Sequence, residues 1–163
     1  MLELAVGTAR NLAHYPPTVR VTGIELSPEM LAIAQRRAQE LGRDADLRLG
    51  DAEALEFPDA SFDTVVCTLA LCTIPNPRQA VAEARRVLRP GGRLLLLEHV
   101  RSPVRAVRAV ERLIEPLALR FEADHLTREP LEYLTAEDFT IERLERTKWG
   151  IVERVLARTP AAA

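Results

Sequence analysis

The sequence predicts an α/β fold: a single doubly wound sheet, mostly parallel, that ends in an antiparallel hairpin. Over the first hundred residues, short apolar runs alternate with amphipathic segments, as in strands joined by helical crossovers. At the end of the chain, residues 139–146 and 151–158 alternate like two strands, with Trp149 and Gly150 between them. The length of 163 residues suits one core, so we expect a single domain over residues 1–163.

The first half of the chain carries clear start and stop signals for strands and helices. Continuously apolar runs predict strands that are buried on both faces. Ser27 and Pro28 open a helix, because serine caps free N–H groups and proline fits the first turn. Asn76 and Pro77 open another helix, and the turn at residues 89–92 (RPGG) ends it. The expected strands are 2–6, 18–26, 46–49, 62–69 and 93–100, and the expected helices are 8–14, 27–42 and 76–88.

The pattern changes after Pro103, where two further helices are expected. Residues 104–121 place valine, leucine and isoleucine at helical spacing and include several arginines. The default interpretation is a helix that covers the sheet and exposes its arginines, and contact with a membrane surface is the alternative. Thr127 is expected to open a short helix over residues 127–134, with Pro130 in its first turn.

Composition excludes several classes of partner. The formal net charge of -2 gives no sign of a nucleic-acid surface, so we expect no nucleic-acid partner. Cys67 and Cys72 have no histidine nearby and make a poor zinc site, so we expect no metal and two buried, reduced thiols. Reduced thiols, the lack of a visible signal peptide and the lack of an apolar run of about 20 residues predict a cytoplasmic protein.

Small or acidic residues follow each of the first three expected strands. After the first strand, Gly7 stands between Ala5 and Ala9, which is a degraded form of a glycine-rich ligand loop. Glu25 and Asp51 stand at the ends of the next two strands. Each feature alone has a structural interpretation: a plain strand-to-helix turn, a partner for a helix dipole, or a loop former. Because parallel strands end at one edge of a sheet, their joint spacing favours a ligand crevice.

Five motifs resemble those of class I S-adenosylmethionine-dependent methyltransferases, which have a Rossmann-like sheet. They are residues 2–9 (LELAVGTA), 23–27 (GIELS), 49–53 (LGDAE), 58–63 (PDASFD) and 87–94 (VLRPGGRL). The last two motifs are typical of the subgroup that includes ubiquinone and menaquinone biosynthesis enzymes. Within that subgroup, three later segments resemble small phosphatidylethanolamine N-methyltransferase-like and alkyl-thiol methyltransferase-like proteins: 97–102, 124–129 and 148–150.

The resemblance implies that the chain binds S-adenosylmethionine and releases S-adenosylhomocysteine. Residues 1–100 would form the cofactor-binding half, and residues 101–163 would supply substrate-side helices and the C-terminal hairpin. The family usually has glycine where Ala5 and Ala9 stand, so each alanine adds a methyl group next to the cofactor. Family members carry an N-terminal helical segment over the cofactor, which we expect this chain to lack. A second subunit as the cover, and hence a homodimer, stays open.

The resemblance also implies roles for individual residues. Glu25 would hold the ribose hydroxyls, and Leu26 would pack on the adenine ring. Asp51, with Ala52 beside it, would accept a hydrogen bond from the adenine amino group. The methionine part of the cofactor would lie over the first turn, and its reacting methyl group would lie beside the end of the fourth strand. The residues implied at these two places are Glu3, Ala5, Gly7, Thr8, Thr68 and Leu69.

Methyl transfer from a sulfonium is an in-line displacement in which the protein mainly positions the two reactants. A base is needed when the acceptor must lose a proton, and His99 and His125 are the candidate catalytic residues. The alternative for His99 is an orienting or merely packed side chain. Asp124, His125 and Arg128 either line the acceptor side or form a helix cap and surface salt bridges.

The function implied by the resemblance is methyl transfer from S-adenosylmethionine to a nitrogen, sulfur or oxygen atom of a small-molecule or lipid-like acceptor. The alternative is a protein that binds the cofactor and is catalytically silent. Both interpretations predict cofactor binding, and only the first predicts transfer.

Overall fold

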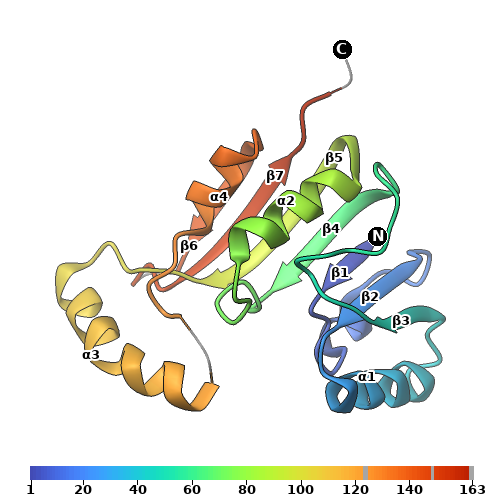
Figure 1. Cartoon of the computed structure of the whole chain (residues 1–163), viewed down its shortest axis with the longest axis horizontal. Coiled ribbons are helices and arrows are strands. Elements are labelled where there is room, and N and C mark those ends of the chain that lie inside the picture. Colours follow the sequence, from blue (N-terminus) through green and yellow to red (C-terminus); the bar gives the residue numbers. More distant parts are fainter. Residues whose placement is uncertain (123–124, 148, 162–163) are drawn as a thin grey trace.

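The computed structural model describes residues 1–122, 125–147 and 149–161. Within these residues, seven strands form one sheet in the order β3-β2-β1-β4-β5-β7-β6 (Figure 1). Strands β1 to β5 are parallel, and β7 runs antiparallel to both of its neighbours. The predicted fold class and the C-terminal hairpin are therefore confirmed. The strands are β1 (Leu2–Leu4), β2 (Val21–Glu25), β3 (Ala45–Leu49), β4 (Phe62–Thr68), β5 (Leu88–His99), β6 (Thr140–Arg146) and β7 (Val152–Arg158).

Helices pack against both faces of the sheet. On one face, the 3₁₀ helix η1 (Arg10–His14) and α1 (Pro28–Glu40) pack on β1 to β3 through Leu12, Ala34 and Ala38. On the other face, α2 (Pro77–Val87) and α4 (Pro130–Ala136) cover the middle strands. The remaining helix of the described residues, α3 (Arg105–Glu122), extends past the end of the sheet (Figure 1).

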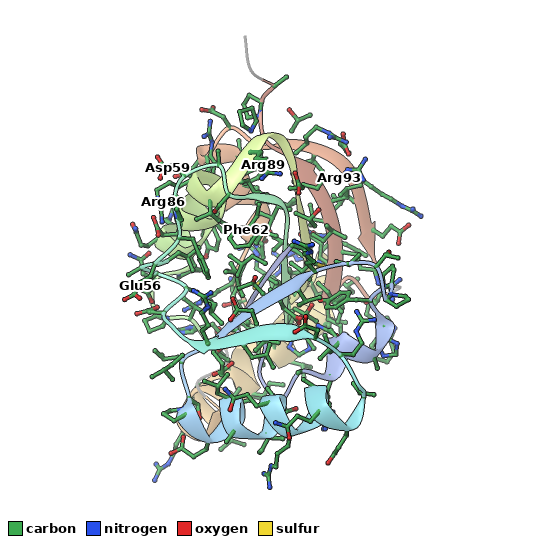
Figure 2. All side chains as sticks on the ribbon, turned by 90° about the vertical axis from the view of Figure 1, so that its right-hand side faces the viewer. Glu56, Asp59, Phe62, Arg86, Arg89 and Arg93 are labelled. Atoms are coloured by element: carbon green, nitrogen blue, oxygen red, sulfur yellow. The ribbon has the colours of Figure 1, made fainter. Side chains whose placement is uncertain are left out.

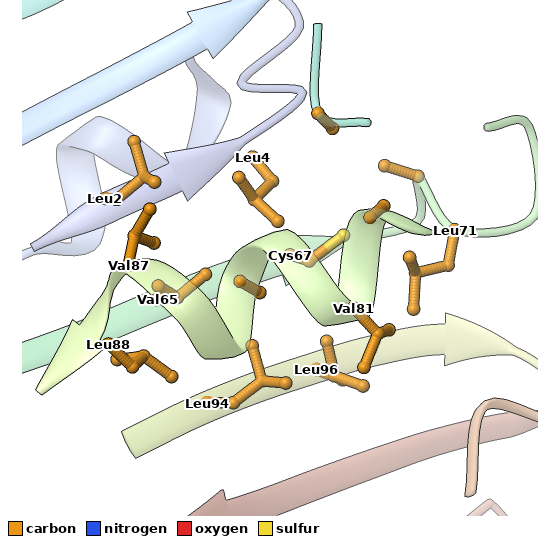
Figure 3. Packing of buried hydrophobic residues seen from close by; sticks show 14 of the residues in the cluster. Leu2, Leu4, Val65, Cys67, Leu71, Val81, Val87, Leu88, Leu94 and Leu96 are labelled. Atoms are coloured by element: carbon orange, nitrogen blue, oxygen red, sulfur yellow. The ribbon is translucent and has the colours of Figure 1, made fainter. Parts of the chain in front are cut away.

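The larger core lies between α2 and the central strands (Figure 3). Alternate residues of β4 and β5 point into it, among them Val65, Cys67 and Leu94, and Val81 and Val87 of α2 pack on them. Burying each such valine or leucine stabilises the fold by roughly 1.5–3 kcal/mol relative to exposure. This core fixes the relative positions of the strand ends, where the candidate site residues lie.

The predicted helix starts are confirmed by their hydrogen bonds. The Ser27 hydroxyl accepts from the Met30 N–H at 3.2 Å, and the Asn76 side chain accepts from the Gln79 N–H at 3.2 Å. Each cap satisfies one of the free N–H groups at a helix N-terminus. Both predicted free thiols, on Cys67 and Cys72, are also confirmed as buried.

Several predicted boundaries differ from the structure, two of them for tertiary reasons. Thr127 does not open α4, because its hydroxyl donates to Glu115 Oε1 at 2.7 Å, and the helix begins at Pro130. Strand β5 begins at Leu88 and not at residue 93, since Leu88 pairs with β4 and the glycines of the turn bond to the chain after β7. The first helix is a single 3₁₀ segment, whose end precedes Pro16.

The motifs at residues 58–63 and 87–94 lie near each other at the amino-terminal edge of the parallel strands (Figure 2). Beside them, Arg86 joins α2 to the loop between β3 and β4. The Arg86 guanidinium donates to both oxygens of Glu83 and to Asp59. It also donates to the carbonyl oxygens of Leu55 and Phe57, each at 2.8 Å. One side chain therefore holds residues 55–59 of the loop between β3 and β4.

We expect Arg86→Ala to lower the free energy of unfolding by about 2 kcal/mol, because two partly buried carbonyl groups lose their donor. Arg89→Ala is the matched control. Its pair with Asp63 lies on the surface, and exposed pairs contribute below about 1 kcal/mol. Urea denaturation of both variants measures the difference, and equal losses would contradict the special role of Arg86.

Candidate cofactor site

A cavity of about 410 Å³ lies at the carboxyl ends of β1, β2 and β3. This is the edge at which open α/β sheets bind ligands. Two carboxylates face an otherwise small or apolar lining, so the cavity suits a ligand with both hydroxyl or amino donors and a flat apolar ring. The lining residues are Ala5, Ile24, Glu25, Leu26, Ser27, Gly50, Asp51, Ala52, Thr73, Ile74 and Pro75.

The turn after β1 has three residues in the left-handed region. Ala5, Gly7 and Ala9 have φ angles of 48°, 58° and 57°. Glycine takes this conformation without steric cost, whereas an alanine pays roughly 1–2 kcal/mol. The two alanines therefore hold a glycine-type turn under strain, and the turn still directs the Gly7 N–H toward the cavity carboxylate.

Glu25 is the most firmly placed polar group of the cavity. Its Oε2 accepts from the Gly7 N–H at 2.8 Å, and its Oε1 accepts from the Ser27 N–H at 3.0 Å. The residue is only 7% exposed. Each carboxylate oxygen has a second lone pair, so Glu25 can still accept two ligand hydroxyls. These donors preorganise the carboxylate before any ligand binds.

Asp51 and Leu26 border the same cavity and are exposed. Asp51 Oδ1 accepts from the Glu53 N–H at 2.8 Å, a local turn that fixes its carboxylate. Leu26 is 63% exposed, which is unusual for a leucine next to a buried strand. An apolar side chain and a carboxylate that line one cavity suit a flat heterocycle that carries an amino group.

Asn11 links β1 to the carboxyl end of β4. Its side-chain amide donates to Glu3 Oε1 at 2.7 Å and to the Thr68 hydroxyl at 3.2 Å. Burial raises the pKa of Glu3, and the Asn11 hydrogen bond opposes that shift. The sequence prediction missed Asn11. The only signal for it was a polar residue in a short segment directly after the turn.

The predicted cofactor residues do not all lie together. Ala5, Glu25, Leu26, Asp51 and Ala52 line the cavity. Gly7 is joined to it through its N–H bond to Glu25. Glu3 lies on β1, Thr68 ends β4 and Leu69 follows it, and none of the three is among the lining residues. Thr8 is turned toward α1, because its carbonyl and hydroxyl oxygens accept from Arg37. The roles of all ten residues stay predictions.

A buried carboxylate holds the loop after β4, which supplies three of the lining residues. Glu98 Oε1 accepts from the N–H groups of Ala70 and Leu71, each at 3.1 Å, and from the Cys67 thiol at 3.4 Å. Burial raises the pKa of Glu98, although these donors oppose the shift. The preceding residue of the loop, Leu69, has a left-handed φ of 52° and is exposed. A lone carboxylate inside an apolar strand was the available sequence signal.

The segment after α3 holds the same loop from its carbonyl side. Arg128 donates to the carbonyl oxygens of Leu71 and Ile74, the latter at 2.6 Å. The His125 backbone N–H donates to the Cys72 carbonyl at 3.0 Å. These bonds couple the segment after α3 to the loop that lines the cavity. The acceptor-side role of Arg128 stays a prediction, and Asp124 lies outside the described residues.

The two candidate catalytic histidines occupy different surroundings. His99 ends β5, two residues after Leu97, which lies opposite Thr68 in the parallel ladder. Because alternate strand residues share a face, His99 stands on the same face as Thr68. His125 is half-buried in the segment that pairs with the loop after β4.

We expect Ala5→Gly to increase the free energy of unfolding by about 0.5–1 kcal/mol, because it relieves left-handed strain. Ala9→Gly is the matched comparison at nearly the same φ. The Ala9 methyl group is fully buried, so losing it offsets the gain by about 0.8 kcal/mol. Thermal unfolding of both variants tests this difference, and a larger gain for Ala9→Gly would contradict it.

The strand order, the reversed β7 and the acidic residues at the ends of β2 and β3 define a class I S-adenosylmethionine-dependent methyltransferase fold. The chain belongs to the methyltransferase domain family, whose model matches residues 2–96. S-adenosylmethionine is the cofactor of this class, and the donors and acceptors of the cavity fit it.

Known relatives and solved structures agree with this membership. The chain is 40% identical over 116 residues to phosphatidylethanolamine N-methyltransferase from Cereibacter sphaeroides, covering 70% of this chain and 57% of that protein. It is 33% identical over 150 residues to thiol S-methyltransferase from Rattus norvegicus, covering 89% of this chain and 62% of that protein. The chain thus spans less than two thirds of the length of these relatives. A methyltransferase structure from Methanosarcina mazei shares the fold, with a TM-score of 0.78 at 24% identity, over 99% of this chain and 92% of that one.

Proposed function

We propose that this chain binds S-adenosylmethionine and transfers its methyl group to a small-molecule or lipid-like acceptor. The observation that carries the proposal is the buried Glu25 carboxylate, held by two backbone N–H groups at the rim of the cavity. The cofactor supplies an electrophilic methyl group on a sulfonium. The chain must therefore bind it, align the acceptor and exclude water.

The roles that we propose within the cavity follow the chemistry of its lining. Glu25 accepts the two ribose hydroxyls, and Leu26 packs on the adenine ring. Asp51 accepts from the adenine amino group, beside the Ala52 N–H. The strained turn that contains Ala5 supports the methionine part of the cofactor through its backbone.

We propose that residues around the reacting methyl group position the cofactor and the acceptor. Thr68 is oriented by the Asn11 amide, which also holds Glu3. Leu69 offers an exposed apolar side chain next to it, which helps to exclude water. The loop that follows is held by Glu98 and Arg128, so we expect it to keep its place when the reactants bind.

The acceptor that we propose carries a nitrogen or sulfur nucleophile. The names of two relatives specify phosphatidylethanolamine and thiols, whose reacting atoms are an amine nitrogen and a sulfur. An ammonium group must lose a proton before its nitrogen lone pair can attack, and a thiol attacks as its thiolate. A nearby proton acceptor is therefore useful, and His99 shares a strand face with Thr68.

Isothermal titration with S-adenosylmethionine and S-adenosylhomocysteine tests cofactor binding directly. We expect one saturable site for each compound, and no heat at high cofactor concentration would remove the cofactor assignment. A screen with radiolabelled methyl groups then tests transfer to phosphatidylethanolamine and to alkyl thiols. Binding without transfer to any acceptor would favour the catalytically silent alternative.

We expect His99→Ala to lower kcat by about a hundredfold and to leave cofactor affinity unchanged, because general-base catalysis contributes on this scale. His125→Ala is the comparison, since its side chain can be removed without loss of its backbone bond to Cys72. Rates with an acceptor at several pH values distinguish the two. A loss confined to the His125 variant would move the proton acceptor to that residue.

A further inference from the structure

Helix α3 is attached to the rest of the chain through its polar side. Both Glu111 oxygens accept from the Ser102 N–H, at 3.3 and 3.0 Å. Glu115 accepts from the Thr127 hydroxyl at 2.7 Å, and Arg108 donates to the Ser102 carbonyl at 2.9 Å. The acidic side chains of this helix that the structure describes therefore point inward and are used for attachment.

The opposite side of α3 is apolar and exposed. Val110, Leu113, Ile114 and Leu117 follow the spacing of one helical stripe, and we call these four residues the α3 stripe. Leu113 is 79% exposed and Leu117 is 61% exposed. The default interpretation from the sequence, in which this side covers the sheet, is wrong. A contiguous exposed apolar surface of this kind marks an interaction site.

The charges that border the α3 stripe identify the chemistry of its partner. Among the described side chains of α3, the exposed charged ones are Arg105, Arg112 and Arg120. Because Glu111 and Glu115 are turned inward, no described carboxylate of the helix neutralises these arginines at the surface. An exposed apolar stripe bordered by cations is complementary to the interface of an anionic lipid layer.

We propose that α3 docks on anionic phospholipid surfaces, with its stripe at the boundary between headgroups and acyl chains. The three arginines then contact lipid phosphates. With 18 residues, α3 is about 27 Å long and offers several turns to the interface. No helix in residues 1–122, 125–147 and 149–161 is long and apolar enough to cross a bilayer.

The position of α3 relates this surface to the candidate site. The helix begins six residues after His99, at the carboxyl end of β5, and lies beyond the arrowheads of β4 and β5 in Figure 1. The loop that holds Leu69 is joined to the segment after α3 by Arg128. Docking through α3 therefore brings the site-bearing edge of the sheet toward the lipid layer. This proposal concerns binding alone and does not depend on methyl transfer.

Sedimentation with vesicles tests the proposal on the whole chain, without cofactor or acceptor. We expect binding to mixed phosphatidylcholine and phosphatidylglycerol vesicles, and weak binding to phosphatidylcholine alone. Leu113→Glu and Leu117→Glu should each weaken binding by about tenfold, because each removes one leucine from the interface. Replacing each arginine by glutamine should weaken binding to the anionic vesicles by about fivefold.

Leu144→Glu is the matched control, since Leu144 is an exposed leucine on the edge strand β6 and should leave vesicle binding unchanged. Thermal unfolding of every variant confirms the fold. Equal binding to both vesicle types, or binding that survives both leucine substitutions, would overturn the proposal. So would a dimer in sedimentation equilibrium that Leu113→Glu dissociates while vesicle binding is absent, because the stripe would then belong to a second copy.

Discussion

Glu25→Ala is expected to weaken S-adenosylmethionine binding by about a hundredfold to ten-thousandfold. Two hydrogen bonds from ligand hydroxyls to a charged acceptor contribute roughly 1.5–3 kcal/mol each, and the substitution removes both. The loss should be the same for S-adenosylhomocysteine, because the ribose is common to both compounds. Isothermal titration of the wild-type chain and the variant measures the ratio.

The same substitution also leaves the N–H groups of Gly7 and Ser27 without their acceptor, at a cost of about 1–3 kcal/mol in folding stability. Glu25→Gln separates the two effects, since its amide oxygen keeps an acceptor in place while the charge is lost. We expect an intermediate loss of about tenfold in affinity for it. Glu40→Ala, on the exposed end of α1, is the control that should bind normally. Unchanged affinity in Glu25→Ala would remove Glu25 from the ribose role.

Local signals in the sequence were sufficient for most elements. Ser27 and Asn76 act as caps through bonds to N–H groups three residues away, so their effect is readable within a short window. Apolar runs also identified the strands, but burial on both faces is seen in β1 and not in β4 or β5, whose buried residues alternate with partly buried or exposed ones. The boundary errors at Thr127 and Leu88 arise because each residue bonds or pairs with a partner from another part of the chain.

The sequence predicted those residues of the candidate site that lie at or just beyond the end of a strand. Glu25 is the last residue of β2 and Asp51 lies just beyond β3, so strand assignment alone placed them at one edge. The role of Asn11 and the carbonyl partners of Arg128 escaped prediction, because each side chain contacts a residue 57 positions away in the sequence. Periodicity also identified the apolar side of α3 correctly, yet periodicity does not say what that side faces.

Glu98→Ala is expected to lower the free energy of unfolding by about 3 kcal/mol or more. The substitution removes the acceptor of the Ala70 and Leu71 N–H groups and of the Cys67 thiol, all buried, and leaves a cavity. The loop after β4 then loses its amide-side attachment, so we also expect weaker cofactor binding. Urea denaturation and isothermal titration measure the two effects.

Glu98→Gln distinguishes a structural acceptor from a titrating carboxyl group. Burial raises the pKa of Glu98 above its ordinary value of 4.5. As pH rises from that value to the raised folded-state pKa, the unfolded chain ionises while folded Glu98 stays protonated, so the wild-type chain loses stability. Glutamine resembles the protonated form and does not titrate. The free energy of unfolding of Glu98→Gln should therefore rise relative to that of the wild type across this pH interval. Below and above the interval, the difference between the two free energies should be constant.

The difference between the two proteins isolates Glu98, because the buried carboxyl groups of Glu3 and Glu153 also have raised pKa values and occur in both. Free energies of unfolding at a series of pH values provide this comparison. Parallel curves would show that Glu98 has the same pKa in the folded and unfolded chain, and the attachment of the loop would then rest on an ionised carboxylate. A converging pair of curves as pH falls toward 4.5 supports a protonated Glu98 as the acceptor that holds the loop beside Thr68.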